Sequence, residues 1–236
     1  MKRLSLFLVA TLFCLTAAAV PLAPGQTVTV GDTNGNPFTP SPVAGDANGL
    51  YTNVTINVNG SNVGVAAGLF SLNYDNGSGW EQLLAFCLSP DVWLQPFDNP
   101  YTVYALGSSP HAAASGRIAE FWGRFRGLVT NDINAAAFQI GLWELAFDAA
   151  AGINLAAGNF RYTTAGSVLS TAQGWLSQLD GSGPMANLVV LVDNPNTTVR
   201  RQNLVTEVPE PATVALLAAA VLGAGFLARR RALAAR

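Results

Sequence analysis

The sequence predicts a mainly β domain with a helical insertion, an α+β fold whose antiparallel strands form a sandwich or a barrel-like sheet beside about three helices. One observation is the period-two alternation of apolar and polar residues from Leu50 to Asn59, typical of a half-buried strand. A second is the pair of hairpin signals Asn59-Gly-Ser-Asn62 and Asp75-Asn-Gly-Ser-Gly79. A third is helical spacing of apolar residues between residues 111 and 180.

Strands are expected along most of the chain. The central meander comprises residues 50–59, 63–74 and 80–88, and Gly64 and Gly68 in its second strand suggest bulges. The other expected strands are Thr27–Val30, Tyr101–Leu106, Phe160–Thr163, Ala186–Asp193 and Val199–Val205.

Three helices are expected between these strands. His111–Gly127 and Ser167–Leu179 each place apolar residues three, four and seven apart. Ile133–Phe147 follows the capping residues Thr130, Asn131 and Asp132 and is apolar on most sides, which predicts a buried helix.

The composition favours an extracellular domain and excludes several functions. Only 11% of the 236 residues are charged, 23 are glycine and the net charge is −2, so no basic footprint for nucleic acid is present. Asp32, Asn34 and Asn36 resemble the start of a calcium loop, but Pro37 and Val43 occupy positions that require Gly and Glu. We therefore expect no metal ion and no cofactor.

The N-terminus has the three parts of a secretory signal peptide, expected to span residues 1–19. Lys2 and Arg3 precede the apolar run Leu4–Leu15, and small residues lead to a cleavage site between Ala19 and Val20. This predicts export through Sec-type machinery and an extracytoplasmic domain of residues 20–205. Cys14 leaves with the signal peptide, so Cys87 is the single cysteine of the mature protein.

The C-terminal segment, residues 206–236, is also built from three parts. Pro209, Glu210 and Pro211 precede the uncharged run Ala212–Ala228, and Arg229, Arg230 and Arg231 begin a basic tail of residues 229–236. As a helix the run would be roughly 25 Å long, close to the thickness of the hydrocarbon core. The three arginines should stay in the cytoplasm, so the sequence predicts a transmembrane helix over 212–228.

This order of parts resembles the PEP-CTERM sorting signal of bacterial surface proteins. The resemblance implies a membrane protease of the exosortase type that cuts near Pro209–Pro211, and a membrane-anchored intermediate that later reaches the cell surface. It further suggests a Gram-negative bacterium with extracellular polysaccharide, and a structural or adhesive role in adhesion or biofilm.

One pair of residues suggests chemistry. Phe86-Cys87-Leu88 ends a strand, and Gln139 and Trp143 share a face of the buried helix. This pairing resembles the thioester domains of bacterial adhesins, in which a cysteine condenses with a glutamine and later reacts with an amine of a partner. Two positions differ from that pattern: Ser89 stands where an acidic residue is common, and Gly141 replaces the usual alanine.

Other functions remain open. Cys87 can be a small buried hydrophobe, and Gln139 can bond a neighbouring strand. Without a known catalytic motif we expect no enzyme, and His111, the only histidine, is expected to be packed or on the surface. The alternative function is a hydrolase or carbohydrate-binding module on a β-sandwich. Its candidate residues also have simpler interpretations: core packing for the tryptophans, and a solvated or capping role for Asp91, Asp98, Glu120 and Asp148.

Overall fold

The longest strand, β3 (Ser61–Asp75), organises the sheet because its two halves pair with different neighbours. Residues 61–69 pair with β2 (Leu50–Val58), and residues 70–75 pair with β4 (Trp80–Cys87). In this computed structural model the described residues are 22–31, 38, 48–94, 99–148, 152–193 and 200–208. They belong to one compact unit bounded by Pro21 and Pro209.

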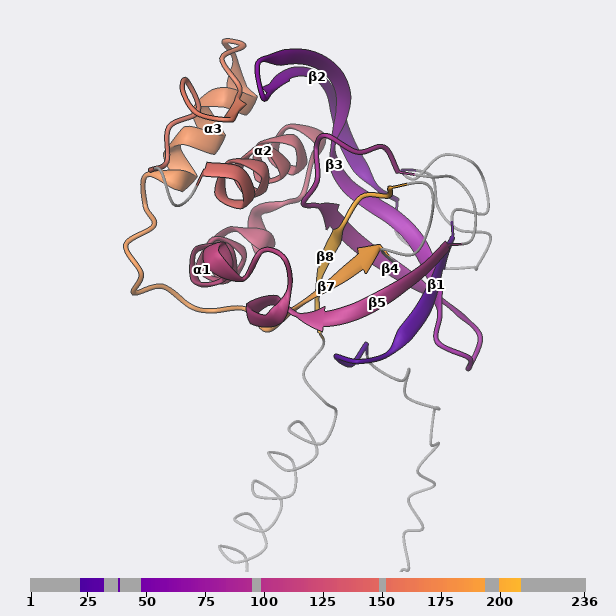
Figure 1. Cartoon of the computed structure of the whole chain (residues 1–236). Helices are drawn as coiled ribbons and strands as arrows, with labels where there is room; N and C mark the ends of the chain where they lie inside the picture. Colours follow the sequence, from indigo (N-terminus) through magenta and orange to yellow (C-terminus); the bar gives the residue numbers. More distant parts are fainter. Residues whose placement is uncertain are drawn as a thin grey trace, which may run out of the picture. The chain divides into compact units, whose positions relative to one another are not determined.

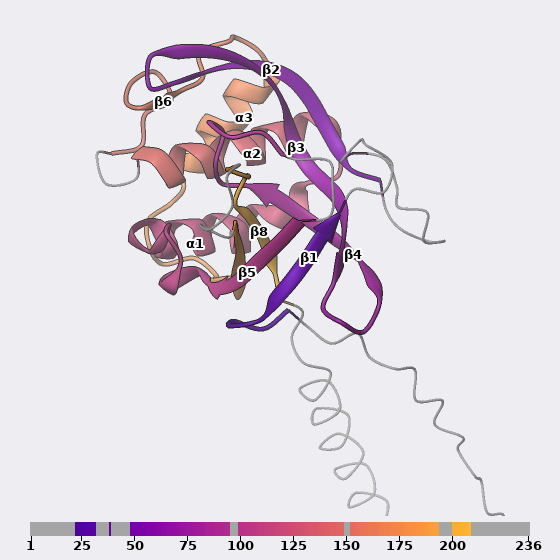
Figure 2. The ribbon, with the colours of Figure 1, turned by 45° about the vertical axis from the view of Figure 1, so that its right-hand side comes forward.

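Six antiparallel strands close into a barrel. The order runs β1 (Thr27–Gly31), β5 (Asn99–Ala105), β7 (Leu188–Asp193), β8 (Leu204–Glu207), β4 and β3. The ring closes because β1 also pairs with β3, from Thr29 opposite Asp75 to Gly31 opposite Asn73. β2 and the two-residue β6 (Phe160–Arg161) extend the sheet beyond the ring (Figures 1 and 2). Of the two expected forms, the sheet is therefore barrel-like.

The predicted hairpin turns form as their residues suggest. Asn59 and Gly60 both have positive φ, 50° and 87°, which is the two-residue turn that matches the twist of β2 and β3. In the next hairpin the Asp75 carboxylate accepts hydrogen bonds from the N–H groups of Gly77 and Gly79, at 2.7 and 3.1 Å. Both turns fix the register of the meander.

Two details of the strands differ from the sequence prediction. The β2–β3 register is unbroken, so neither Gly64 nor Gly68 forms a bulge. Gly68 instead permits close approach, because a Cβ there would overlap the main chain of Leu50 and Tyr51. The last strand is Leu204–Glu207 rather than Val199–Val205, so it continues past the predicted end of the domain at residue 205.

The helices lie together on one side of the barrel, while the β2–β3 hairpin extends beside α2 and α3 (Figures 1 and 2). They are α1 (Ser115–Phe125), α2 (Asp132–Asp148) and α3 (Ser167–Leu176), close to the predicted ranges. Short 3₁₀ turns occur at Leu106–Ser108, Ala112–Ala114 and Arg126–Leu128. Asn131 caps α2 by accepting a 2.9 Å hydrogen bond from the N–H of Asn134, and α2 is buried as predicted.

An aromatic cluster fills the space between the end of β4 and the helices. Phe138 of α2 contacts Phe86 of β4 and Phe121 of α1, with ring centroids 4.7 and 4.8 Å apart. Trp122 and Trp175 pack against the same Phe138 ring. The strand that ends at Cys87 is thereby held rigidly against α2.

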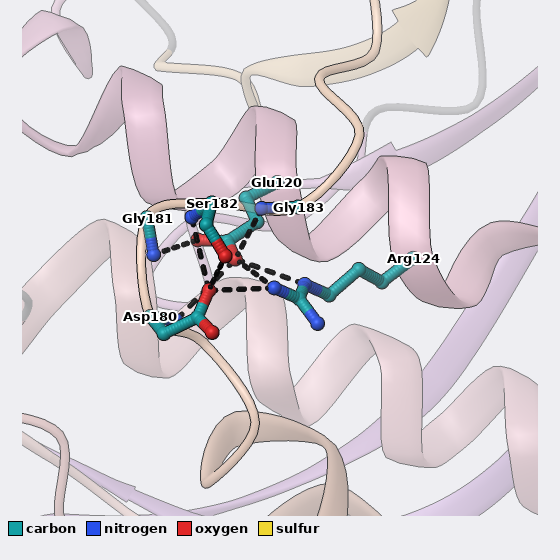
Figure 3. Close-up of polar contacts among 6 residues, drawn as sticks. All are labelled: Glu120, Arg124, Asp180, Gly181, Ser182 and Gly183. Atoms are coloured by element: carbon teal, nitrogen blue, oxygen red, sulfur yellow. Dashed lines mark hydrogen bonds and ion pairs between the residues drawn. The ribbon is translucent and has the colours of Figure 1, made fainter.

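A buried carboxylate ties the loop after α3 to α1 (Figure 3). Glu120 accepts hydrogen bonds from the N–H groups of Asp180, Gly181 and Gly183 and pairs with Arg124 at 2.8 Å. Burial alone would raise the pKa of Glu120, but these donors prevail and hold it below its ordinary value. Its described partners are the N–H groups of this loop and Arg124 of α1 itself, so this cluster is structural.

Candidate functional site

The site begins where β4 leaves its neighbour β3. Their pairing ends at Ala85 opposite Phe70, because beyond that point β3 pairs with β2 instead. On its other edge β4 stays paired with β8 through Phe86, and the N–H of Leu88 donates to the carbonyl of Asn203 at 2.8 Å. Successive strand residues direct their main-chain groups to opposite edges. Cys87 therefore faces the position that β3 has left.

The Gln139 side chain occupies that position. Its Oε1 accepts a hydrogen bond from the N–H of Cys87 at 2.9 Å, and its Nε2 donates to the Cys87 carbonyl at 2.7 Å. Both residues are fully buried, so without the amide two main-chain groups would lack partners in the core. The structure thus brings together the two residues that the sequence singles out, through the main chain of Cys87.

Burial dominates the chemistry of the thiol. Desolvation raises the pKa of Cys87 to about 12, against weaker opposing effects of the Trp143 indole and the Ser89 N–H. Ser89 donates to the sulfur at 3.2 Å. The thiol is therefore neutral at physiological pH, and any reaction must move its proton within the site.

Gly141 has a packing reason in this chain. A Cβ at this position would overlap the ring of Phe121, which lies against α2. The alanine of the adhesin pattern cannot fit while α1 keeps this position. The other difference, Ser89, contributes its N–H to the sulfur, so it contacts the site directly.

Trp143 separates the thiol from a cavity of about 270 Å³. We call this cavity the Trp143 pocket. Its apolar walls come from β3 and from the segment that follows Cys87, with Gln202 at one side. The described lining residues are Phe38, Val63, Val65, Ala66, Phe70, Pro90, Asp91, Val92, Trp93, Leu94, Trp143 and Gln202. Sequence reasoning singled out Trp143 but missed Gln202, which stands in an irregular segment without a motif.

Each acidic candidate within the described residues contacts groups of the protein itself. Glu120 and Asp148 are buried rather than solvated, and Asp148 accepts hydrogen bonds from the N–H groups of Asn159 and Phe160 at 3.0 and 2.7 Å. Asp91 forms a 3.7 Å ion pair with Arg200, and Asp98 lies outside the described residues. The two buried carboxylates bind main-chain N–H groups away from the start of a helix, so they are neither solvated nor helix caps.

His111 and the tryptophans complete the sequence candidates. The Nε2 of His111 lies 3.3 Å from the Nδ2 of Asn203, and burial lowers the pKa of the imidazole. Three tryptophans are buried, but Trp80 and Trp93 are 40% and 65% exposed, so core packing does not describe these two. Across the described ranges no group of three or more His, Cys, Asp or Glu residues could hold a metal ion.

The targeting segments lie outside the described residues. These include the signal peptide with its Ala19–Val20 cleavage site, Pro209–Pro211, the apolar run 212–228 and Arg229–Arg231. In the part of the chain that the structure describes, no helix is long and apolar enough to cross a membrane.

Comparison with known families identifies the C-terminal segment. Residues 207–231 match the PEP-CTERM protein-sorting motif. The chain is therefore an exported protein that an exosortase-type membrane protease sorts, anchored first in the membrane and then placed at the cell surface. No curated protein and no solved structure matches the chain.

Proposed function

We propose that the exported domain is a surface adhesin, acting in biofilm or an exopolysaccharide matrix, in which Cys87 and Gln139 condense to an internal thioester. The observation that carries this proposal is the pair of hydrogen bonds between the Gln139 amide and the main chain of Cys87. They hold the amide beside the residue whose thiol would attack it, which gives the reaction a high effective molarity.

The first step forms the thioester and releases ammonia. The Cys87 sulfur attacks Cδ of Gln139, and negative charge develops on Oε1, which already accepts the Cys87 N–H at 2.9 Å. The bond from Cδ to Nε2 then breaks, and the thiol proton leaves with that nitrogen as ammonia. The overall step is neutral, which suits a buried thiol whose pKa is about 12.

The second step would attach the protein to its target. A primary amine of a surface protein or polysaccharide attacks the thioester carbonyl, forms an amide and transfers its proton to the departing sulfur. Neither Cys87 nor Gln139 lines the Trp143 pocket, so an amine in this pocket would reach the buried pair only after the Trp143 side chain moves aside.

Intact-mass spectrometry of the exported chain, after removal of the predicted signal peptide with Cys14, tests the first step. The expected result is a deficit of about 17 Da, one ammonia, and a thiol that cannot be alkylated until methylamine opens the thioester. Cys87→Ala and Gln139→Glu should both restore the full mass. The matched control Gln173→Glu changes an exposed glutamine of α3 and should keep the deficit.

Succinimide formation at Asn59-Gly60 or Asn76-Gly77 would also release ammonia, so the mass alone is insufficient. That loss would persist in the Cys87→Ala variant and would leave Cys87 alkylatable in the parent chain. An unmodified mass together with a freely alkylated Cys87 would refute the thioester and leave Gln139 with its hydrogen-bonding role.

A further inference from the structure

Gln202 lines the Trp143 pocket and carries a polar atom that the protein itself does not satisfy. This side chain is 9% exposed, and within the described residues its amide Oε1 has no hydrogen-bond partner. The indole of Trp143 instead lies close enough to the Cys87 thiol to lower its pKa, so its N–H is directed toward the thiol, which does not line the pocket. A buried acceptor without a partner is costly, so the Gln202 oxygen beside this cavity points to a ligand.

The Gln202 amide oxygen can only accept a hydrogen bond, so its ligand must present a donor. A hydroxyl group supplies one. The surrounding walls are mostly apolar, so the matching ligand carries hydroxyl groups on a carbon framework.

A second hollow continues from this pocket along the β2–β3 hairpin. It measures about 550 Å³ and shares Val65, Ala66 and Trp93 with the pocket. We call it the β2–β3 groove; its described polar or aromatic lining residues are Thr52, Asn53, Thr55, Trp93, Tyr162 and Thr164. Hydroxyl and amide groups among these residues suit a polar ligand that extends along the hairpin.

Trp93 stands at the junction of the two hollows. It is the most exposed of the large hydrophobic side chains in the described structure, at 65%. A flat indole there offers its face to a ring whose C–H groups point toward it. The position therefore suits a sugar ring that spans from the groove into the pocket.

Charge restricts the ligand further. None of the described residues that line the β2–β3 groove is charged, and Asp91 is the one charged residue in the described lining of the Trp143 pocket. Its carboxylate already lies 3.7 Å from Arg200. Neither hollow presents an unbalanced charge, which favours a neutral ligand over an anionic polymer.

We propose that the Trp143 pocket and the β2–β3 groove form a binding site for a neutral oligosaccharide. One sugar ring stacks on Trp93 and donates a hydroxyl hydrogen bond to Oε1 of Gln202, and further sugars follow the groove. This binding is non-covalent and does not require a thioester.

Isothermal titration of the full-length chain tests the proposal, in a detergent without a sugar headgroup. The probes are cellohexaose, chitohexaose, maltohexaose and mannohexaose, each raised to about 10 mM, the weak end of specific binding. At least one should bind. Trp93→Ala should weaken that binding about tenfold or more, equivalent to the loss of one stacked ring.

Two control variants sharpen the result. Trp80→Ala removes another exposed tryptophan, 40% accessible and outside both hollows, and should leave the affinity unchanged. Gln202→Met should weaken binding several-fold and raise the melting temperature of the free protein, because it removes an unsatisfied buried acceptor. Substitution of a residue with only a packing role would not lower the affinity and raise the melting temperature together.

The Cys87→Ala variant separates this proposal from the thioester. Oligosaccharide binding should persist in this variant, which cannot form a thioester. The two proposals can therefore fail independently of each other. No heat of binding with any of the four probes would overturn the oligosaccharide site. Binding that survives Trp93→Ala, or a preference for a peptide in competition, would overturn it equally.

Discussion

A double-mutant cycle at Cys87 and Gln139 separates a hydrogen-bonded pair from a covalent one. The variants are Cys87→Ala, Gln139→Leu and their combination, and the measured quantity is the free energy of unfolding in urea. Removing the Gln139 amide leaves the N–H and carbonyl of residue 87 without partners in the core, whichever side chain residue 87 carries. We expect this loss to cost about 3 kcal/mol wherever the amide is intact, and therefore in both backgrounds if no thioester forms.

A thioester would add a second contribution that depends on both side chains. It would link positions 52 residues apart, and closing a loop of that length in the unfolded chain stabilises the folded state by about 4 kcal/mol. Forming the thioester releases Nε2, so in the parent chain only the hydrogen bond to the Cys87 N–H remains, worth about 1.5 kcal/mol. Gln139→Leu should then cost about 5.5 kcal/mol in the parent chain and about 3 kcal/mol in the Cys87→Ala background. The coupling energy of the cycle should be about 2.5 kcal/mol.

The assay is urea denaturation followed by circular dichroism and by tryptophan fluorescence, with coincident transitions required before free energies are compared. A coupling energy below about 1 kcal/mol would refute the covalent link. A cost of Gln139→Leu near zero in the Cys87→Ala background would instead refute the role of the amide as the replacement for strand β3.

Four further predictions follow from single contacts. Burial raises the pKa of Glu144 to about 7. In the unfolded chain this carboxyl loses its proton near the ordinary pKa of glutamate, whereas in the folded protein it keeps the proton. The free energy of unfolding should therefore fall as the pH rises toward 7. Glu144→Gln should flatten that slope in urea titrations from pH 4 to 8. Glu120 has the opposite pH dependence, because its pKa is lowered in the folded protein. Its contribution to the free energy of unfolding is present above the ordinary pKa of glutamate and is lost as the pH falls through the folded pKa. Glu120→Gln should therefore cost about 2 kcal/mol at pH 7 and less in acid. Gly141→Ala should cost about 1–3 kcal/mol because the new methyl group overlaps Phe121, and an unchanged melting temperature would contradict that packing. Glu210→Ala should leave the full-length chain in the membrane fraction on immunoblots, and normal release would count against processing at the triplet.

Local patterns predicted the elements of this fold well because their signals lie within a few residues. The Asn59-Gly60 turn and the Asn131 cap act through the main chain next to them, so the sequence around each was sufficient. Closure of the barrel was not predictable in this way. It depends on β1 pairing with β3, more than forty residues away, and a short alternating strand does not specify its partner.

The site was predictable in part, because some of its residues stand in recognisable local patterns. A resemblance in pattern singled out Cys87, Gln139 and Trp143, and the structure places the first two in contact. The sequence also suggested that Gln139 could bond a neighbouring strand, and it does. It could not indicate that the bonded main chain would be that of Cys87, since this follows from β3 turning away toward β2. Gln202 was missed because a polar residue in an irregular segment is usually solvated, and only the fold shows that it is buried beside a cavity.

The position of strand β8 has a consequence for the order of events during export. β8 joins β7 to β4 and ends at Glu207, and the matched sorting motif begins at that same residue. Export that begins at the predicted signal peptide would move the chain N-terminus first, so β8 would be among the last parts of the domain to leave the cytoplasm. The barrel can therefore be completed by β8 only once export has reached the sorting motif, when translocation of the domain is nearly finished.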